Sequence, residues 1–509
     1  MKQNLMTATP DPPVAAAPVA AAPGEQLSMW ARRERRLSNI LFWVVLAAGV
    51  ALRIFFAFSV GHLEDSDHAV VYLISKHVSE GQIDWFFWGQ PYGGTLLEIL
   101  AGGAMVVFGP SLAVLTIVEI AVITVAAVLL RAIATHALGR TAGNVAAMLF
   151  VFPGFVILRQ STTDGGFYNT SLCLGLLVIF LALRAPVRKS YLLWAAIGFA
   201  SGLALWQSPM GAAFAAPAFV IAAVRHRSWR HILVGVLAAI VGALPWLSEA
   251  VGGTAFARQG AAPGGFHFSS VISFFTTLIP ALVPVYDKPE RFIVTALALA
   301  ALALLVVLTI VRRSLWIGAL TVGTFLCMAV IIVAANDVLT AATVRYAIYL
   351  SPAFAVALAW LFTRIRFVGL FAALLAAGLT FSQTLSYSNN LQLGTDAEFG
   401  AGYQQLESLL ESHGVEAAYG EYWLAYRLTA VSNEDVNIAS LNAHPYEPYD
   451  DEAAAQRRTA IVVFTGDAAD TFLSSTAGLP TSTRIEDGDY TIYLFDSVVD
   501  PHSLVGAPY

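Results

Sequence analysis

Long apolar runs follow one another along most of this chain and constrain its fold more than any other feature. Eleven of them are roughly 15 to 22 residues long, close to the ~20 residues with which a helix crosses a bilayer. With 57% hydrophobic and 12% charged residues among 509, the chain has more apolar surface than one soluble core could cover. We therefore predict a polytopic α-helical membrane protein. The runs cover residues 40 to 60, 112 to 130, 142 to 158, 167 to 183, 191 to 207, 210 to 224, 232 to 248, 291 to 311, 315 to 334, 346 to 363 and 367 to 385.

The distribution of positive charge predicts how these runs cross the membrane. A twelfth run, Gly94 to Phe108, is short and carries Glu98, so its length does not settle whether it spans. Short cytoplasmic loops are enriched in Lys and Arg. If the N-terminal arginines lie inside and the twelfth run lies along the surface, the inner loops hold twelve basic residues and the later outer loops hold five. We therefore expect about eleven spans, with the N-terminus in the cytoplasm and the C-terminus outside. The inner residues are Arg131, Arg140, Arg184, Arg188, Lys189, Arg225, Arg227, Arg230, Arg312, Arg313, Arg364 and Arg366, and the outer ones are Arg159, Arg258, Lys288, Arg291 and Arg345.

The same pattern divides the chain into three parts. Residues 1–38 are rich in proline and alanine and are expected to form a disordered cytoplasmic tail. Residues 39–388 form the transmembrane domain, whose first outer loop, 62–111, is expected to contain two interfacial helices. In the first of these helices Ser66 is placed to cap the N-terminus and Gly81 to end it. Its apolar positions, at helical spacing, are Val70, Val71, Ile74 and Val78.

The composition changes sharply after the last apolar run. Residues 396–509 contain 19 acidic and four basic residues, a net charge of −15, so the rest of the chain must carry +9 to reach the stated −6. Helical and strand patterns alternate here, and Asp487-Gly488 is a hairpin turn signal. We predict a separate extracytoplasmic α/β domain, and its acidity argues against nucleic acid as a partner.

The chemistry-bearing residues gather in the outer loops. The sequence contains no Walker A motif, no Gly-rich dinucleotide fingerprint after a strand, and no His-Glu-x-x-His or Cys-x-x-Cys metal signature. Three outer positions stand out: the acidic run Glu64 to Asp67, Asp164 in a short loop, and Arg345-Tyr346 at the start of a late apolar run. A carboxylate can take a proton from a hydroxyl nucleophile, and a guanidinium can bind a leaving phosphate bidentately. Two carboxylates can instead hold a divalent cation that stabilises the same charge.

Several short motifs resemble one family of membrane enzymes. They are Asp65-Ser66-Asp67-His68-Ala69, the stretch from Phe87 to Leu96, Phe108-Gly109-Pro110-Ser111, Trp206 to Gly211, Gly242 to Trp246, Arg345-Tyr346 and Glu421 to Thr429. Together they resemble bacterial glycosyltransferases related to the protein O-mannosyltransferases. The wider group is the GT-C superfamily, which includes the lipid A aminoarabinose transferase and oligosaccharyltransferase catalytic subunits.

The resemblance implies an enzyme of the plasma membrane. It would move a hexose or pentose from a polyprenyl-phosphate-linked donor to a glycan, lipid or protein hydroxyl on the outer face, with inversion. It assigns the catalytic acid to Asp67, although the family usually has a second acid where this chain has His68. It places Asp164 at a second-loop acid, and Arg345 with Tyr346 at the donor phosphate. A divalent cation on Asp67 and Asp164 is the one cofactor implied as possible. The expected substrate pocket comprises Asp65, His68, Trp88, Gln90, Tyr92 and Glu98.

Structural roles are the alternatives at each of these positions. Asp67 can complement a helix dipole, Asp164 can be a turn residue beside two glycines, and Arg345 can be an interfacial arginine. Glu98 faces either the site or the water side of a surface helix. For the whole chain the alternative is a transporter or flippase for a lipid-linked saccharide, although such proteins usually carry mid-membrane ionisable residues in structural repeats. No internal repeat is evident in the sequence.

Overall fold

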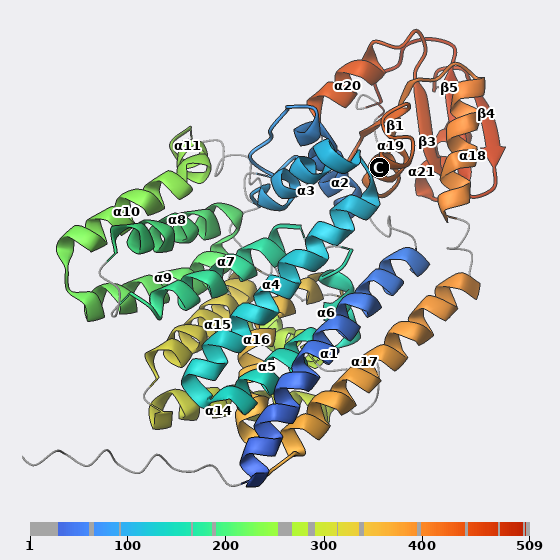
Figure 1. The fold of residues 1–509 in the computed structure, drawn as a ribbon. Helices are drawn as coiled ribbons and strands as arrows, with labels where there is room; N and C mark the ends of the chain where they lie inside the picture. Colours follow the sequence, from blue (N-terminus) through green and yellow to red (C-terminus); the bar gives the residue numbers. More distant parts are fainter. Residues whose placement is uncertain are drawn as a thin grey trace, which may run out of the picture.

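The structure is a computed structural model that describes residues 29–60, 66–90, 93–163, 166–185, 190–252, 267–282, 291–312, 314–334, 341–393, 399–442, 446–476, 479–501 and 504. A bundle of apolar helices carries a smaller sheet domain at one end, and two short helices lie between them (Figure 1). Of the N-terminal tail predicted over residues 1–38, residues 1–28 lie outside the described residues, and residues 29–38 are not disordered but form the start of helix α1 (Met29–Val60).

Each apolar run predicted from the sequence corresponds to one helix or to a broken pair of helical segments. In the part of the chain that the structure describes, five helices are long and apolar enough to cross a bilayer, or six if the bent pair α10 and α11 is one span. The protein is thus a multi-pass membrane protein, while the count of eleven spans stays a prediction. The helical segments of the bundle are α1 (Met29–Val60), α4 (Leu112–Leu138), α5 (Arg140–Val151), α6 (Phe155–Gln160), α7 (Gly166–Ala182), α8 (Tyr191–Gln207), α9 (Pro209–His226), α10 (Trp229–Gly242), α11 (Leu244–Gly252), α13 (Phe268–Ser273), η1 (Phe274–Leu278), η2 (Pro280–Leu282), α14 (Arg291–Arg312), α15 (Leu315–Ala334), η3 (Ala341–Tyr349), α16 (Ser351–Phe362) and α17 (Val368–Leu393).

Three of the predicted runs are interrupted, and a proline lies at or next to each break. The run from 232 to 248 separates into α10 and α11 at Ala243, just before Pro245. The run from 142 to 158 separates into α5 and α6 around Pro153-Gly154. The run from 346 to 363 begins as the 3-10 helix η3 and continues as α16, which has Pro352 in its first turn. Proline lacks a backbone N–H and its ring clashes with the preceding turn, so it favours a break that hydropathy alone does not register. Arg345 and Tyr346 accordingly belong to η3 and not to a long spanning helix.

Glycines bring α8 and α10 into backbone contact. A Cβ on Gly198 would overlap the carbonyl oxygen of Gly235, and a Cβ on Gly202 would overlap that of Ala239. The spacing of Gly198 and Gly202 is the small-xxx-small pattern that lets membrane helices approach closely. This pair of helices is therefore held by backbone proximity that larger residues would prevent.

The segment predicted as the first outer loop contains both expected helices, α2 (Ser66–Ser79) and α3 (Leu96–Phe108). The apolar face predicted for α2 is buried at Val70, Val71 and Ile74. Gly81 follows the helix with φ +92°, the left-handed conformation that suits a helix-ending glycine. The helix α3 packs against α2, because Gly102 leaves room for the carbonyl of Ser75 and the side chain of Val78.

The C-terminal region forms the expected α/β fold. Its strands are β1 (Ala417–Gly420), β2 (Asn437–Ser440), β3 (Ala460–Phe464), β4 (Ser482–Asp487) and β5 (Tyr490–Phe495). They form one sheet in the order β2-β1-β3-β5-β4, in which the β2-β1-β3 pairs are parallel and the pairs made by β5 are antiparallel. The hairpin β4–β5 turns at Gly488, which has φ +60° as the Asp-Gly signal predicts. The helices are α18 (Phe399–Ser412), α19 (Tyr422–Val431), α20 (Glu447–Ala454) and α21 (Ala468–Ser475).

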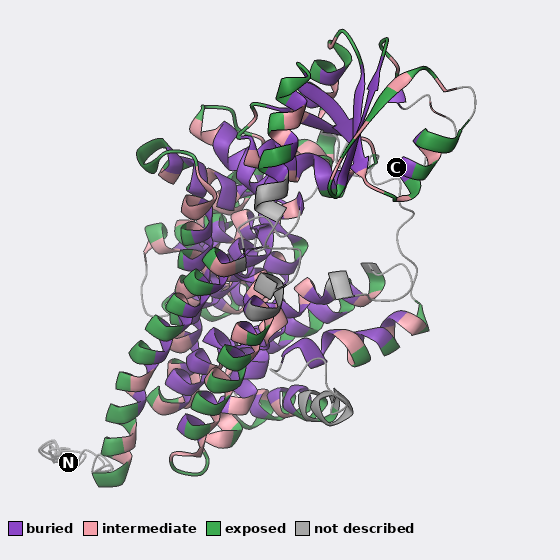
Figure 2. Ribbon diagram, turned by 90° about the vertical axis from the view of Figure 1, so that its right-hand side faces the viewer, coloured by how far each residue is buried: buried purple, intermediate pink, exposed green. Residues whose placement is uncertain are grey.

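The sheet is covered on both faces, and one of its two cores continues into the first outer loop. The helices α18 and α19 pack on one face, where the core includes Leu406, Leu428 and Val462. The core of the other face includes Tyr449 and Ile461 together with apolar residues of α2 and α3. All residues of β1 and β5 are buried (Figure 2). The C-terminal domain is thus not packed as a separate body, because it shares a hydrophobic core with the loop that carries Asp67.

Candidate active site

Asp67 and Arg345 meet where the first outer loop approaches the bundle. Asp67 lies in the first turn of α2, where a helix dipole favours a negative charge. Arg345 lies in η3, and its Nη1 atom is 2.7 Å from Oδ2 of Asp67. The side chains of Arg345 and Asp67 are 28% and 19% exposed, so the pair is partly shielded but reachable. The structure therefore brings together the two charged residues that the sequence assigned to the base and to the phosphate.

A tyrosine from the C-terminal domain completes this group. Tyr422 is the first residue of α19, and its phenol hydroxyl donates a hydrogen bond to Oδ1 of Asp67. The Oγ atom of Ser66 donates to the Tyr422 carbonyl oxygen at 2.7 Å. Ser66, which we expected to cap α2, is the first residue of that helix and is bound to the C-terminal domain. Both oxygens of Asp67 thus have donors, each from a distant part of the chain.

Aromatic rings surround the guanidinium of Arg345. Its Cζ lies 5.6 Å from the ring centre of Tyr168 and 5.9 Å from that of Tyr346. The two rings meet edge to face, with centres 5.7 Å apart. Rings at such distances attract a cation and limit its rotation. Arg345 is thus oriented toward Asp67, which the interfacial-arginine alternative does not require.

Polar side chains buried in the bundle hold the elements around this group. The hydroxyl groups of Ser171 and Tyr349 lie 2.6 Å apart and join α7 to η3. Thr170 donates to Oε1 of Gln207 at 2.5 Å, which joins α7 to the end of α8. Because these bonds are buried, breaking one would leave a polar group without water. The Ser171–Tyr349 contact fixes η3, and therefore Arg345, relative to α7, and the Thr170–Gln207 bond fixes α7 relative to α8.

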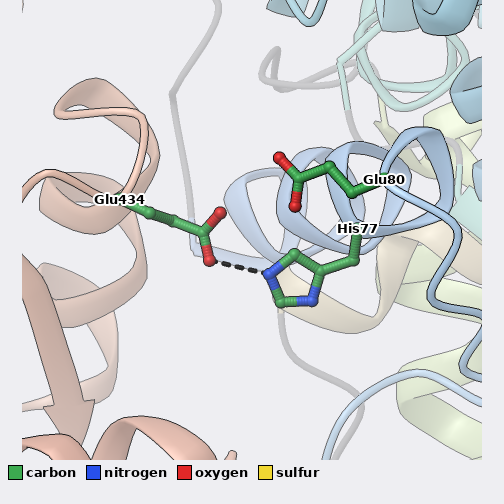
Figure 3. A group of neighbouring side chains, drawn as sticks. All are labelled: His77, Glu80 and Glu434. Carbon is green, nitrogen blue, oxygen red and sulfur yellow. Dashed lines mark hydrogen bonds and ion pairs between the residues drawn. The ribbon is translucent and has the colours of Figure 1, made fainter.

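A second group of charges joins α2 to the C-terminal domain. Glu434 points toward His77 on α2, with an Oε1 to Nε2 distance of 2.7 Å, and Glu80 lies beside them (Figure 3). These three residues place possible metal-ligand atoms within 4.8 Å of one another. However, the Nζ atom of Lys76 lies 2.7 Å from Glu80 and also pairs with Glu434. An ammonium group so placed already compensates both carboxylates, so we interpret Lys76, His77, Glu80 and Glu434 as an ion-pair network and call it the interdomain clamp.

The clamp acts on the pKa of Glu434 and on the backbone around it. Burial raises the pKa of this carboxyl, but hydrogen bonds from His77, Lys76 and Tyr449 outweigh burial and bring the pKa down to about 2. Asn433 and Glu434 have φ of 53° and 72°, a left-handed conformation that costs a non-glycine residue about 1–2 kcal/mol. Asn433 also accepts a hydrogen bond from the Tyr72 hydroxyl at 2.8 Å. The interface with α2 thus holds this turn in a conformation that it would otherwise disfavour.

Two predicted pocket residues are deeply buried. Glu98 is 0% exposed, which excludes the alternative that it faces water, and its two carboxylate oxygens make no hydrogen bond within the described residues. It lies four residues before Gly102, so it is on the side of α3 that packs against α2. His68 is 1% exposed in α2. Burial raises the pKa of the Glu98 carboxyl to about 8, which favours its protonated, uncharged form near pH 7.

The aromatic residue Trp88 lies in the domain interface. Its ring stacks on Tyr446 with centres 3.9 Å apart, and its Nε1 atom donates to Asp84 at 2.7 Å. Gln90 is partly buried, and its backbone N–H donates to the carbonyl of Phe87. Trp88 therefore contributes to domain packing, and its predicted contact with a sugar stays a prediction.

Three predicted site residues, Asp65, Tyr92 and Asp164, lie outside the described residues. Whether the residues fit the cation expected between Asp67 and Asp164 can therefore be examined only at Asp67. There the guanidinium of Arg345 and the phenol of Tyr422 already engage both carboxylate oxygens. A cationic group and a hydrogen-bond donor at these distances do not fit a metal ion on the same oxygens.

Sequence reasoning missed the contacts that Tyr422, Tyr168 and Glu434 make in this region. The stretch from Glu421 belongs to one of the motifs that resemble the family, but nothing in its composition indicates that Tyr422 reaches Asp67. The only local signal for Glu434 is its place in the turn between a helix and a strand. Such contacts depend on how the domain docks, which periodicity does not encode.

Comparisons with known proteins identify the fold. No protein-family model and no curated protein matches the chain. Among solved structures, ArnT from Cupriavidus metallidurans bound to undecaprenyl phosphate matches with a TM-score of 0.60 and 14% identity over 91% of this chain and 99% of that chain. Its apo state matches with a TM-score of 0.57 and 14% identity over 90% and 98%. The Archaeoglobus fulgidus oligosaccharyltransferase in complex with Zn and sulfate matches with a TM-score of 0.50 and 14% identity over 84% and 69%. The chain therefore shares the fold of these membrane enzymes, which the sequence resemblance implied.

Proposed function

We propose that this protein is a membrane glycosyltransferase that uses a lipid-linked sugar donor. The observation that carries the proposal is the 2.7 Å contact between Asp67 and Arg345, a possible base and a possible phosphate ligand, in a GT-C fold. ArnT, the structure with the same fold over nearly its whole length, was solved with undecaprenyl phosphate bound. The donor of this chain is accordingly a polyprenyl-phosphate sugar, hexose or pentose, and its acceptor is a hydroxyl group of the cell envelope.

The proposed reaction is a single displacement at the anomeric carbon. Asp67 accepts the proton of the acceptor hydroxyl as the acceptor oxygen forms its bond to that carbon. The bond between the carbon and the phosphate oxygen breaks, and its electron pair leaves with the polyprenyl phosphate. Because the nucleophile enters opposite the leaving phosphate, the configuration inverts. Arg345 and Tyr346 bind the phosphate, on which negative charge develops.

The ion pair suggests how donor binding prepares the base. Arg345 donates to Oδ2 of Asp67. A phosphate offers the guanidinium a bidentate partner, which a single carboxylate oxygen in this geometry does not. When part of the guanidinium's interaction is exchanged from Asp67 to the phosphate, less positive charge compensates Asp67, so the carboxylate becomes a stronger base. The exchange would thus link activation of Asp67 to occupancy of the donor site.

The placement of the site supports an outer-face reaction. The helices α1 and α17 both end on the side where α2 meets the C-terminal domain (Figure 1). An N-terminus on the opposite side then requires an odd number of crossings, as eleven spans would give. With the arginine-rich loops inside, the C-terminal domain and Asp67 lie outside the plasma membrane.

The proposal is tested with purified protein in lipid nanodiscs. Polyprenyl-phosphate mannose and a panel of other polyprenyl-phosphate hexoses and pentoses are supplied with glycan, lipid and protein acceptors from the cell envelope. We expect the wild type to consume one donor, Asp67→Asn to lose most of that activity, and the exposed control Asp496→Asn to retain it. A wild type that binds a donor without consuming it in nanodiscs, and moves it across the bilayer when reconstituted in closed vesicles, would indicate the flippase alternative instead.

A further inference from the structure

The hydroxyl of Tyr422 donates a hydrogen bond to the Asp67 carboxylate, as the hydroxyl of an acceptor must do before it loses its proton to that base. It donates to Oδ1 of Asp67, and Arg345 donates to Oδ2. A sugar or serine hydroxyl approaching its base would be an O–H donor to the same carboxylate. The phenol and the acceptor therefore compete for one oxygen of Asp67.

Tyr422 is held in this place by its backbone as well as by its ring. It is 3% exposed, and its N–H donates to the Oδ1 atom of Asn442 at 2.9 Å. Its carbonyl accepts the hydrogen bond from Ser66 on α2. The phenol is thus positioned before any substrate arrives, so its contact with Asp67 costs little further ordering.

Water competes with the acceptor for the donor sugar, and the contact between Tyr422 and Asp67 would act against this competition. A glycosyl donor is open to attack by water as well as by an acceptor, and Asp67 would accept a proton from either. A water molecule is small enough to reach any exposed carboxylate oxygen, whereas an acceptor docks through many groups. A residue that occupies Oδ1 until an acceptor displaces it would suppress the reaction with water.

We propose that Tyr422 determines whether the donor sugar goes to the acceptor or to water, by occupying Oδ1 of Asp67 until an acceptor hydroxyl replaces its phenol. This inference rests on the proposed function. In the suppressed reaction, the oxygen of water bonds to the anomeric carbon, its proton passes to Asp67, and the bond to the phosphate breaks. The products are free sugar and polyprenyl phosphate.

The test measures free sugar released from the donor in the absence of acceptor. Tyr422→Phe removes only the hydroxyl, and we expect hydrolysis to rise about tenfold, the effect of losing one hydrogen bond to a charged group. Ser66→Ala, which removes a hydrogen bond to the backbone of Tyr422, should raise the rate of hydrolysis by a smaller factor. The matched control is Tyr191→Phe, because Tyr191 stacks on His231, far along the chain from the site.

The outcomes separate the possible roles of Tyr422. If it only positions Asp67, Tyr422→Phe lowers hydrolysis and transfer by the same factor, and the inference is wrong. Unchanged hydrolysis in a variant that elutes and melts like the wild type also overturns it. If the wild type neither transfers nor hydrolyses any donor, the proposed function itself is contradicted. If the wild type is active and Tyr422→Phe hydrolyses the donor at the same rate, only the inference about Tyr422 is wrong.

Discussion

Arg345 and Asp67 are 278 residues apart in the chain and form an ion pair of 2.7 Å. Replacing Arg345 with Gln leaves a polar side chain of similar reach but removes the positive charge. We expect kcat/KM for the donor to fall about 10- to 100-fold, the usual effect of losing a charged hydrogen bond. Arg345→Lys should recover part of this loss, because it restores the charge but not the bidentate geometry. Steady-state kinetics over donor concentration measure both variants, and equal activity of Gln and wild type would contradict the assignment.

The interdomain clamp should depend on pH through Glu434. Its pKa is lowered from 4.5 to about 2, so its contribution to stability is complete above about pH 4.5 and is lost as pH falls toward 2. We expect Glu434→Gln to have a lower melting temperature than the wild type at pH 7 and a similar one near pH 2. Exposed Glu486 offers the control substitution, Glu486→Gln. A difference between wild type and Glu434→Gln that grows on acidification would show that the carboxylate does not stabilise the interface.

The contact between α8 and α10 should not tolerate a methyl group. Gly198→Ala places a Cβ against the carbonyl of Gly235, so the helices must separate, and we expect a loss of about 1–3 kcal/mol in unfolding free energy. Gly378→Ala in α17 is the matched control, since no atom lies within 4 Å of its Cβ position. That control should be neutral or stabilising by up to about 1 kcal/mol. Thermal unfolding of both variants in the same detergent gives the comparison.

We expect Glu98 to lower the stability of the fold and to contribute to transfer activity. Among the described residues its buried carboxylate oxygens have no hydrogen-bond partner, so Glu98→Met should stabilise the fold by about 1–3 kcal/mol. If the carboxyl binds a hydroxyl of the sugar, the same variant should lose transfer activity, and Glu98→Gln should keep more of it. If Glu98→Met has a lower melting temperature than the wild type, Glu98 has a structural role in the packing of α2 and α3.

The sequence predicted local structure much better than it predicted contacts. Apolar runs located the bundle helices because hydropathy is a property of about twenty consecutive residues. It did not locate the breaks at Pro153 and Pro352, where one residue interrupts a run that stays apolar. The alternation after residue 396 predicted the strands, but not their order in the sheet. The proximity of Asp67 to Arg345 followed from a family resemblance, whereas Tyr422 arrives through domain docking, which no short pattern encodes.

The helix α2 carries the base at one end and the clamp residues near the other. Asp67 lies in its first turn, and Lys76 and His77 lie in its last. Each residue of an α-helix turns the chain by about 100°, so inserting or deleting one residue between them would rotate Asp67 away from its partners or the clamp away from Glu434. Substitutions within α2 can be absorbed locally, but its length cannot change without separating the two. Related chains that keep both contacts should therefore show no gaps within this helix.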